Sequence, residues 1–78
     1  SPEESLIGKL EQARIDQAID VLPPAFREVI ILREMEEMSY EQISQVAGIP
    51  VGTVMSRLAR ARALLRRALV ESEGKEQE

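Results

Sequence analysis

The sequence predicts an all-α fold in which four helices pack into one compact domain. β-branched residues never alternate with polar residues over the length of a strand, so no segment has the pattern of a sheet. Only two strong breaker points interrupt the chain, at Pro23-Pro24 and at Gly48-Ile49-Pro50. A chain of 78 residues is also short enough that a single domain accounts for it.

The two ends of the chain are polar and lack apolar periodicity. We therefore expect a disordered start over residues 1–4, the domain over residues 5–70 and a disordered acidic tail over residues 71–78. Because the chain opens at Ser1 without a methionine, we also expect it to be a piece of a longer protein.

The first helix is expected at about residues 5–21. Its apolar positions spread over a wide, ragged face, made of Leu6, Leu10, Ile15, Ala18, Ile19 and Leu22. Pro23 disfavours helical geometry at the residue before it, so the helix should end there.

The second helix is expected at about residues 24–36, because Pro24 suits the first turn of a helix. It is apolar on more than one side, which is typical of a helix that sits centrally or has a partner. Most of this surplus should be internal packing. The remainder is a candidate docking surface for another protein, made of Ile31, Leu32 and Met35.

The third helix is expected at residues 40–47. Ser39 and Gln42 have the spacing of a capping box at its start, and Gly48 is the natural residue to end it in a left-handed conformation. The fourth helix should run over residues 51–69. A helix of two turns, a tight glycine turn and a longer helix predict a helix-turn-helix.

The fourth helix has two unlike faces. One apolar stripe should belong to the core and consists of Val54, Leu58, Ala61, Leu65, Ala68 and Leu69. The opposite side carries small residues and arginine, namely Gly52, Thr53, Ser56, Ala59, Arg60, Ala63 and Arg67. Small side chains let a helix enter a major groove, and a guanidinium can bind guanine or phosphate.

Charge is distributed unevenly along the chain. Residues 42–70 contain five arginines and no acidic residue, so this segment carries +5 and the remainder carries −9, for a net charge of −4. A polyanion should therefore be attracted to one side of the domain and repelled from the others. This pattern indicates nucleic-acid binding by the fourth helix.

The absence of Cys and His excludes thiol nucleophiles, imidazole acid–base chemistry and Cys/His zinc sites. We expect no enzyme activity, no catalytic residues, no cofactor and no metal. No apolar run approaches the length of a membrane span and no signal peptide is recognisable, so a cytoplasmic location is expected.

Three segments of the chain resemble region 4 of bacterial sigma factors, the C-terminal domain of the sigma-70 family, in its extracytoplasmic-function (ECF) group. The segments are residues 22–29 (LPPAFREV), 38–43 (MSYEQI) and 48–62 (GIPVGTVMSRLARAR). The resemblance implies recognition of the −35 promoter element by the helix that opens at Val51. It also implies transcription initiation with RNA polymerase, docking on the flap of the polymerase β subunit, an anti-sigma factor partner and a monomeric state.

The DNA-contacting positions that the resemblance implies are Pro50, Val51, Gly52, Thr53, Met55, Ser56, Arg57, Arg60 and Arg62. Met55 is a departure, since many members have Lys or Arg there; an apolar contact with a thymine methyl could replace the missing contact. Ser44 and Ala47 form another departure, because Ala and Leu are commoner at these positions, and we expect this to reduce the packing between the third and fourth helices without changing the fold.

Two other classes of protein remain open. One is the DNA-binding output domain of a LuxR-type response regulator, which would bind inverted repeats as a dimer. The other is a helix-turn-helix used only for protein–protein contact, which would show no salt-dependent DNA binding.

Overall fold

The computed structural model describes the backbone of residues 2–77 and the side chains of residues 8–72. Within the described backbone the regular elements are all helical, and they are α1 (Pro2–Asp20), α2 (Pro24–Ile30), the π-helical turn η1 (Ile31–Met35), α3 (Tyr40–Ala47) and α4 (Val51–Gln77). The predicted all-α fold with four helices is confirmed. None of these helices, over residues 2–77, has the length and apolar character that crossing a bilayer requires.

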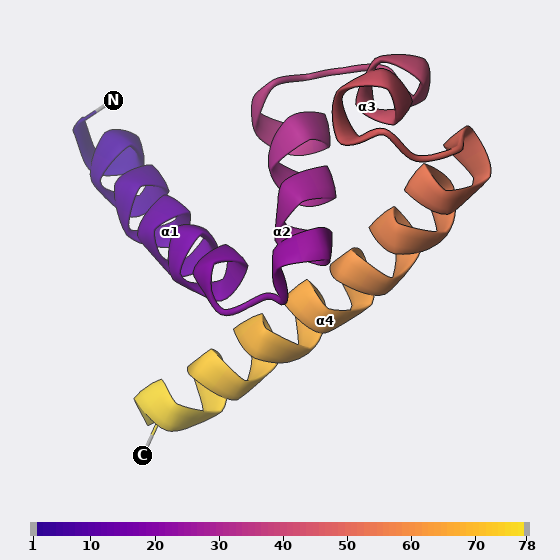
Figure 1. Ribbon diagram of the computed structural model, residues 1–78. Coiled ribbons are helices and arrows are strands. Elements are labelled where there is room, and N and C mark those ends of the chain that lie inside the picture. Colours follow the sequence, from indigo (N-terminus) through magenta and orange to yellow (C-terminus); the bar gives the residue numbers. More distant parts are fainter. Residues whose placement is uncertain (1, 78) are drawn as a thin grey trace.

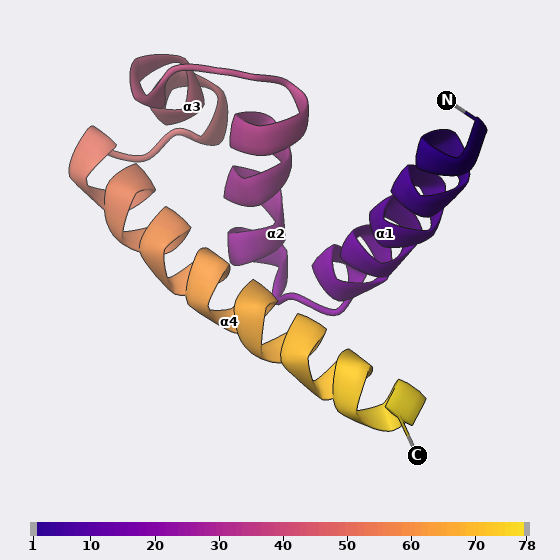
Figure 2. The ribbon, with the colours of Figure 1, turned by 180° about the vertical axis from the view of Figure 1, so that it is seen from behind.

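Helix α4 is the long axis on which the other helices are arranged (Figure 1). Helix α2 stands against the middle of α4 and makes the most extensive contacts with it. Helix α3 lies at the N-terminal end of α4, and α1 slants away on the other side of α2, as the view from behind also shows (Figure 2). The helix-turn-helix of α3 and α4 therefore occupies one end of the molecule.

The core lies where α2, α3 and α4 meet. Its fully buried side chains are Val29, Ile30, Ile43, Val54 and Leu58. The predicted core stripe of α4 is confirmed at its N-terminal half, where Ala61 is also buried, whereas the positions further along the helix are only half-buried. Because the core ends before the end of α4, the last turns of this helix extend beyond the main body of the domain.

Helix α1 joins the core only through its last turn. Ala18, Ile19 and Leu22 are buried and Ile15 is half-buried, as the sequence predicts, but Leu10 is 60% exposed. The side chain of the remaining predicted face residue, Leu6, lies outside the described residues. The N-terminal part of α1 slants away from α2 and α4, which explains why Leu10 is not covered (Figure 1).

The outer two helices are longer than predicted. Helix α1 begins at Pro2 instead of residue 5, and α4 continues to Gln77 instead of ending at residue 69. Proline is tolerated in a first helical turn, and the Glu, Lys and Gln residues after Val70 are good helix formers. The predicted disorder of residues 1–4 and 71–78 concerns segments whose side chains are mostly outside the described residues, and it stays a prediction.

The helix expected over residues 24–36 is present to Met35, but its second half has π geometry. The chain changes from α to π geometry at Ile31, and the amide of Glu36 donates to the carbonyl of Ile31, five residues back, at 3.1 Å. The following turn reverses the chain, with Glu37 at a positive φ of 55°. An apolar pattern predicts a helix here but does not distinguish an α turn from a single π turn.

Candidate nucleic-acid interface

The first helix of the helix-turn-helix is fixed at both ends. The Ser39 hydroxyl accepts from the Gln42 amide at 3.1 Å, and the Gln42 side chain accepts from the Ser39 amide at 2.8 Å, which completes the predicted capping box. At the other end Gly48 has φ +69°, a left-handed conformation that glycine adopts without strain. Helix α3 therefore spans Tyr40–Ala47, as the sequence predicts.

The turn between α3 and α4 is organised by Ser44. Its carbonyl accepts from the amides of Gly48 and Ile49, at 2.9 and 3.1 Å. Its half-buried hydroxyl donates to the carbonyl of Ile49. Alanine at this position would lack the contact that the Ser44 hydroxyl makes with the Ile49 carbonyl. The residue that departs from the family pattern thus adds a bond that ties the turn to α3.

Helix α4 starts immediately after this turn. The amides of Thr53 and Val54 both donate to the carbonyl of Pro50 at 3.0 Å, so the first turn of α4 is closed directly on the turn residue. Gly52 contributes no side chain, and the position that a Cβ atom would take there faces open space. A backbone that is exposed at the N-terminus of a helix can approach another molecule closely and presents the positive end of the helix dipole.

The predicted DNA-contacting residues lie along the N-terminal half of α4 and the turn before it. The exposed ones are Pro50, Gly52, Met55, Ser56 and Arg60. The half-buried ones are Val51, Thr53, Arg57 and Arg62. The set alternates with the buried Val54, Leu58 and Ala61, so that the helix presents its small and basic residues outward while its apolar stripe packs inward.

The hydroxyl and thioether groups on this face differ in their availability. The Ser56 hydroxyl donates to the Thr53 carbonyl at 3.1 Å within the helix, and a hydroxyl in this position can turn toward an external acceptor. Met55 is 54% exposed and carries an apolar group where many members of the resembled family have a cation. The face can therefore offer both hydrogen bonds and an apolar contact.

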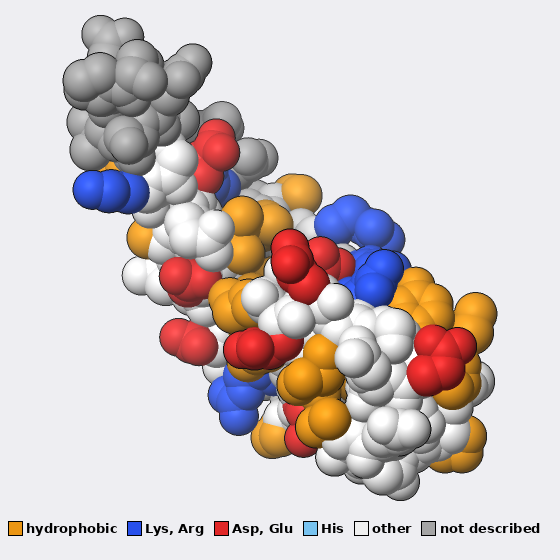
Figure 3. Space-filling model, turned by 90° about the horizontal axis from the view of Figure 1, so that it is seen from above, with side chains coloured by type: hydrophobic (Ala, Val, Ile, Leu, Met, Phe, Trp, Pro, Cys, Tyr) orange, Lys and Arg blue, Asp and Glu red, His pale blue; other side chains and the backbone are white. Residues whose placement is uncertain are grey.

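Basic charge continues along α4. Arg60, Arg66 and Arg67 are exposed, and the segment has no acidic side chain before Glu71. Viewed from above, the face of the molecule in Figure 3 shows acidic side chains scattered among apolar ones, with basic side chains in separate groups. A continuous basic surface is thus absent from that side of the described residues. The five arginines of residues 42–70, which cause the charge asymmetry expected from the sequence, all lie on α4.

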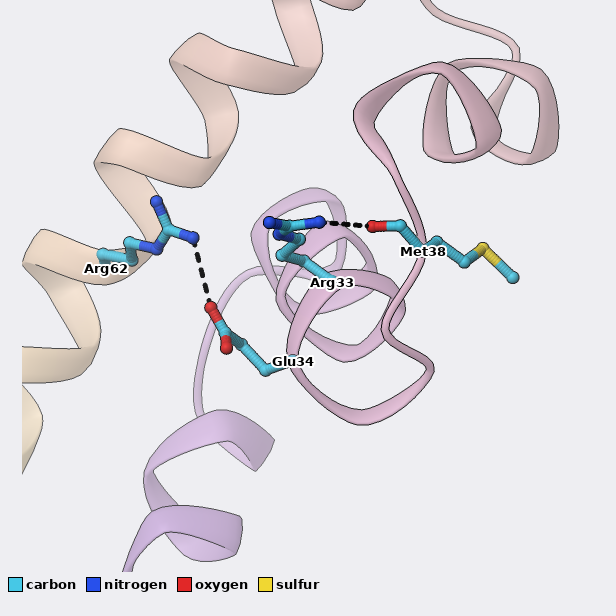
Figure 4. Close-up of polar contacts among 4 residues, drawn as sticks. All are labelled: Arg33, Glu34, Met38 and Arg62. Atoms are coloured by element: carbon cyan, nitrogen blue, oxygen red, sulfur yellow. Dashed lines mark hydrogen bonds and ion pairs between the residues drawn. The ribbon is translucent and has the colours of Figure 1, made fainter.

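Arg62 has a partner within the domain. Its Nη2 atom lies 3.1 Å from Oε1 of Glu34 in η1, and Figure 4 shows the two side chains pointing toward each other across the gap between α4 and η1. Hydrogen bonding to Glu34 raises the pKa of Arg62 above its ordinary value; desolvation opposes this shift, and the Tyr40 hydroxyl adds to it. The sequence analysis did not foresee this pair, because the spacing of 28 residues gives no local signal.

A second arginine lies beside the first residue of α3. The guanidinium of Arg33 lies over the Tyr40 ring, 5.0 Å from its centroid. The same guanidinium donates to the Met38 carbonyl at 2.8 Å, as Figure 4 also shows. Arg33 therefore ties η1 to the start of α3.

The predicted docking residues differ in their exposure. Ile31 and Leu32 are half-buried and pack against the core, as expected for most of the surplus apolar surface of the second helix. Met35 is 47% exposed at the end of η1. Of the three, Met35 presents the most surface to a partner.

Within the described part of the chain, no cluster of three or more His, Cys, Asp or Glu residues could hold a metal ion. A groove of about 420 Å³ between α1 and α4 is lined by Arg14, Gln17, Ala18, Val21, Ala68, Glu71 and Ser72. It lies toward the C-terminal end of α4, away from the helix-turn-helix.

The fold and the site together define a helix-turn-helix domain whose second helix exposes small and basic residues, the arrangement of a DNA-binding module. Comparison with protein families gives the particular group. The family described as Sigma-70, region 4 matches residues 12–65, and the chain belongs to this family.

Relatives with curated names agree with this assignment. Over 69 residues, the chain is 44% identical to the RNA polymerase sigma-H factor of Pseudomonas aeruginosa. The matched segment covers 88% of this chain and 36% of the relative. It is 38% identical to the ECF RNA polymerase sigma factor SigW of Bacillus subtilis (87% and 36%) and 39% identical to the ECF RNA polymerase sigma-E factor of Escherichia coli (80% and 32%). The chain thus spans about a third of the length of these relatives.

Proposed function

We propose that this chain is the −35 recognition domain of an ECF sigma factor and that α4 reads promoter DNA for RNA polymerase. The observation that carries the proposal is the outward face of α4, where exposed Arg60 stands among small residues on a helix segment without acidic side chains. The bonded turn before Val51 supports it, because a reading helix needs a fixed angle to the rest of the domain.

The proposed contacts have distinct roles. The exposed backbone around Gly52 and the side chains of Thr53 and Ser56 approach phosphates or base edges, and Arg60 binds guanine or phosphate. Met55 touches a thymine methyl. This surface is bordered by Pro50, Val51 and Arg57. Arg62 differs from the other predicted contacts, because it pairs with Glu34 within the domain.

The proposed partners follow from membership in the family. The domain acts as a monomer in the cytoplasm, docked on the β flap of RNA polymerase, with Met35 and its neighbours Ile31 and Leu32 as the candidate contact for the polymerase or for an anti-sigma factor. Met35 supports this assignment because its side chain is half exposed beside η1. Region 2 of the sigma factor would supply the contacts that melt DNA.

A selection experiment tests the reading function. The 78-residue chain is incubated with duplexes randomised over eight base pairs, and bound sequences are enriched and identified. We expect one asymmetric site without an inverted repeat. Arg60→Ala should then lower affinity for the enriched duplex by about 10-fold or more, in the range of one lost base contact, and reduce its preference over a scrambled duplex.

Arg67→Ala is the matched control, since Arg67 is also exposed on α4 but lies about 24 Å beyond Val51 at 1.5 Å per residue. It should weaken both duplexes equally and by a smaller factor. Equal, sequence-independent losses in both variants would contradict the role of Arg60. Enrichment of an inverted repeat would favour the dimeric response-regulator class, and salt-independent or absent binding would favour a helix-turn-helix for protein contact.

A further inference from the structure

We propose that Arg62 is a positioning residue: Glu34 holds its guanidinium against η1, so that Arg62 helps to fix the angle of α4 and does not contact DNA phosphates. The resemblance to the family places Arg62 among the DNA contacts, whereas the geometry points to a contact within the domain. The DNA part of this proposal depends on the proposed function, but the contact itself does not.

The direction of the side chain is the first argument. A guanidinium can serve phosphate and carboxylate at once only if both lie within reach of its fixed fork of N–H groups. Arg62 directs Nη2 toward Oε1 of Glu34 at 3.1 Å, as Figure 4 shows. On a helical wheel Arg62 stands about 160° from Arg60 and on the same flank as Met55, since successive residues are 100° apart.

The position of the partners is the second argument. Glu34 belongs to the π turn, and Arg62 lies in the fourth turn of α4. Their contact therefore connects η1 to α4 well beyond the Ser44 turn. Because that turn fixes only the start of α4, an attachment further along adds to the packing of α2 against α4 in setting the direction of the helix axis.

Tyr40 ties η1 to α3 beside this pair. Its ring is covered by Arg33, which is itself held by the Met38 carbonyl. Because a cation is attracted to the face of an aromatic ring, this contact holds η1 against the start of α3. Glu34, the next residue of η1, then supplies the negative charge for Arg62.

The magnitude should be modest, because the side chains of Arg62 and Glu34 are 41% and 54% exposed and solvent screens the pair. We expect Arg62→Ala to lower the melting temperature without DNA by about 1–8 °C. It should weaken binding to the enriched and scrambled duplexes by a similar factor of about 2–5, within the range of a modest change in positioning.

The salt dependence of binding separates a positioning residue from a phosphate contact. Each neutralised phosphate contributes about −0.9 to the slope of log affinity against log salt. We expect Arg62→Ala to leave this slope unchanged. The control is Arg60→Ala, on the exposed face of the same helix. It should make the slope about 0.9 shallower if Arg60 contacts a phosphate, or abolish sequence preference if Arg60 contacts a base.

A charge exchange provides the decisive test. The single variants Glu34→Arg and Arg62→Glu each place two like charges together, and the double variant restores an ion pair with reversed direction. The double variant should recover melting temperature and most of the DNA affinity that either single variant loses. If it recovers the melting temperature but not DNA binding, and Arg62→Ala also lowers the salt slope by about 0.9, Arg62 is a phosphate contact and the proposal is wrong.

The melting temperatures distinguish this proposal from the proposed function. Loss of DNA binding by the wild-type chain under all salt conditions would overturn the function but leave the charge-exchange result as a test of the attachment. Additive effects of the two single variants on melting temperature, with no recovery in the double variant, would overturn the attachment whatever happens with DNA.

Discussion

Glu37 adopts a conformation that its side chain disfavours, in the turn that follows η1. Its φ of 55° lies in the left-handed region, where residues with a Cβ atom are strained and glycine is not. We expect Glu37→Gly to stabilise the domain by about 0.5–1 kcal/mol, because release of strain exceeds the added entropy of the unfolded chain. Thermal unfolding should show a melting temperature about 2–8 °C higher.

The neighbouring residue is a matched control. Glu36 has φ −91° and ψ −6°, so Glu36→Gly removes the same charge without releasing left-handed strain. It should lower or leave unchanged the melting temperature. An equal rise in both variants would mean that the loss of an acidic charge, and not the backbone conformation of Glu37, causes the gain.

Single residues also set the limit of what the sequence could predict at the site. The outward position of Ser56 and Arg60 follows from the helical period, and the structure places both as expected. The partner of Arg62 does not follow from any local pattern, because Glu34 is 28 positions away and reaches it only after η1 and α4 have packed together. The role of Ser44 in the turn likewise depends on the chain folding back to Ile49.

At the scale of elements, α3 depends on its N-cap more than the longer helices do. It has only eight residues, and isolated helices of this length are unstable in water. We expect Ser39→Ala to destabilise the domain by about 1 kcal/mol, because the Gln42 amide loses its acceptor and the Gln42 side chain loses the geometry of the capping box. Urea unfolding monitored by circular dichroism measures the change.

Ser56→Ala makes the same chemical change inside α4 and serves as the control. The Ser56 hydroxyl bonds back to a carbonyl of its own helix, and alanine is a better helix former, so this variant should be neutral or slightly stabilising. Equal destabilisation by both substitutions would exclude a special contribution of the cap.

The presence or absence of chemical markers at helix ends explains why some elements were easier to predict than others. Helix α3 has chemical markers at both ends, Ser39 and Gly48, and its bounds match the prediction. The π turn at Ile31 has none, since its apolar residues fit an α-helix equally well, and only the bond from Glu36 to Ile31 reveals it. The C-terminal extension of α4 lacks an apolar stripe, which is why periodicity ended the prediction at residue 69.

At the scale of the whole molecule, charge is divided unevenly: residues 42–70 carry +5 and the remainder of the chain carries −9. On the proposed function, the cationic segment would attract a duplex, while the surplus of acidic residues elsewhere would repel it when the salt concentration is low. One segment would then carry most of the favourable electrostatics. We therefore expect strong promoter binding to require further contacts from outside this domain, which would raise its effective concentration.

The number of arginines on α4 predicts how steeply binding by the isolated chain depends on salt. With Arg62 held by Glu34, four arginines remain in the segment, and a monomer that neutralised one phosphate with each would have a log–log slope of about −3.6. Fewer contacts would make the slope shallower. Fluorescence anisotropy with a labelled enriched duplex, titrated between 50 and 300 mM salt, measures this slope, and we expect a Kd at physiological salt of about 10⁻⁶ to 10⁻⁴ M.

The same titration decides between one copy and two on the DNA. A dimer on an inverted repeat would bring two basic helices, so the steepest expected slope of log affinity against log salt would double to about −7. A slope no steeper than about −3.6, together with one chain per duplex in sedimentation experiments, would fit a monomer that reads a single asymmetric site. A steeper slope with nanomolar affinity would contradict it, because the charge on one α4 helix is too small to produce either result.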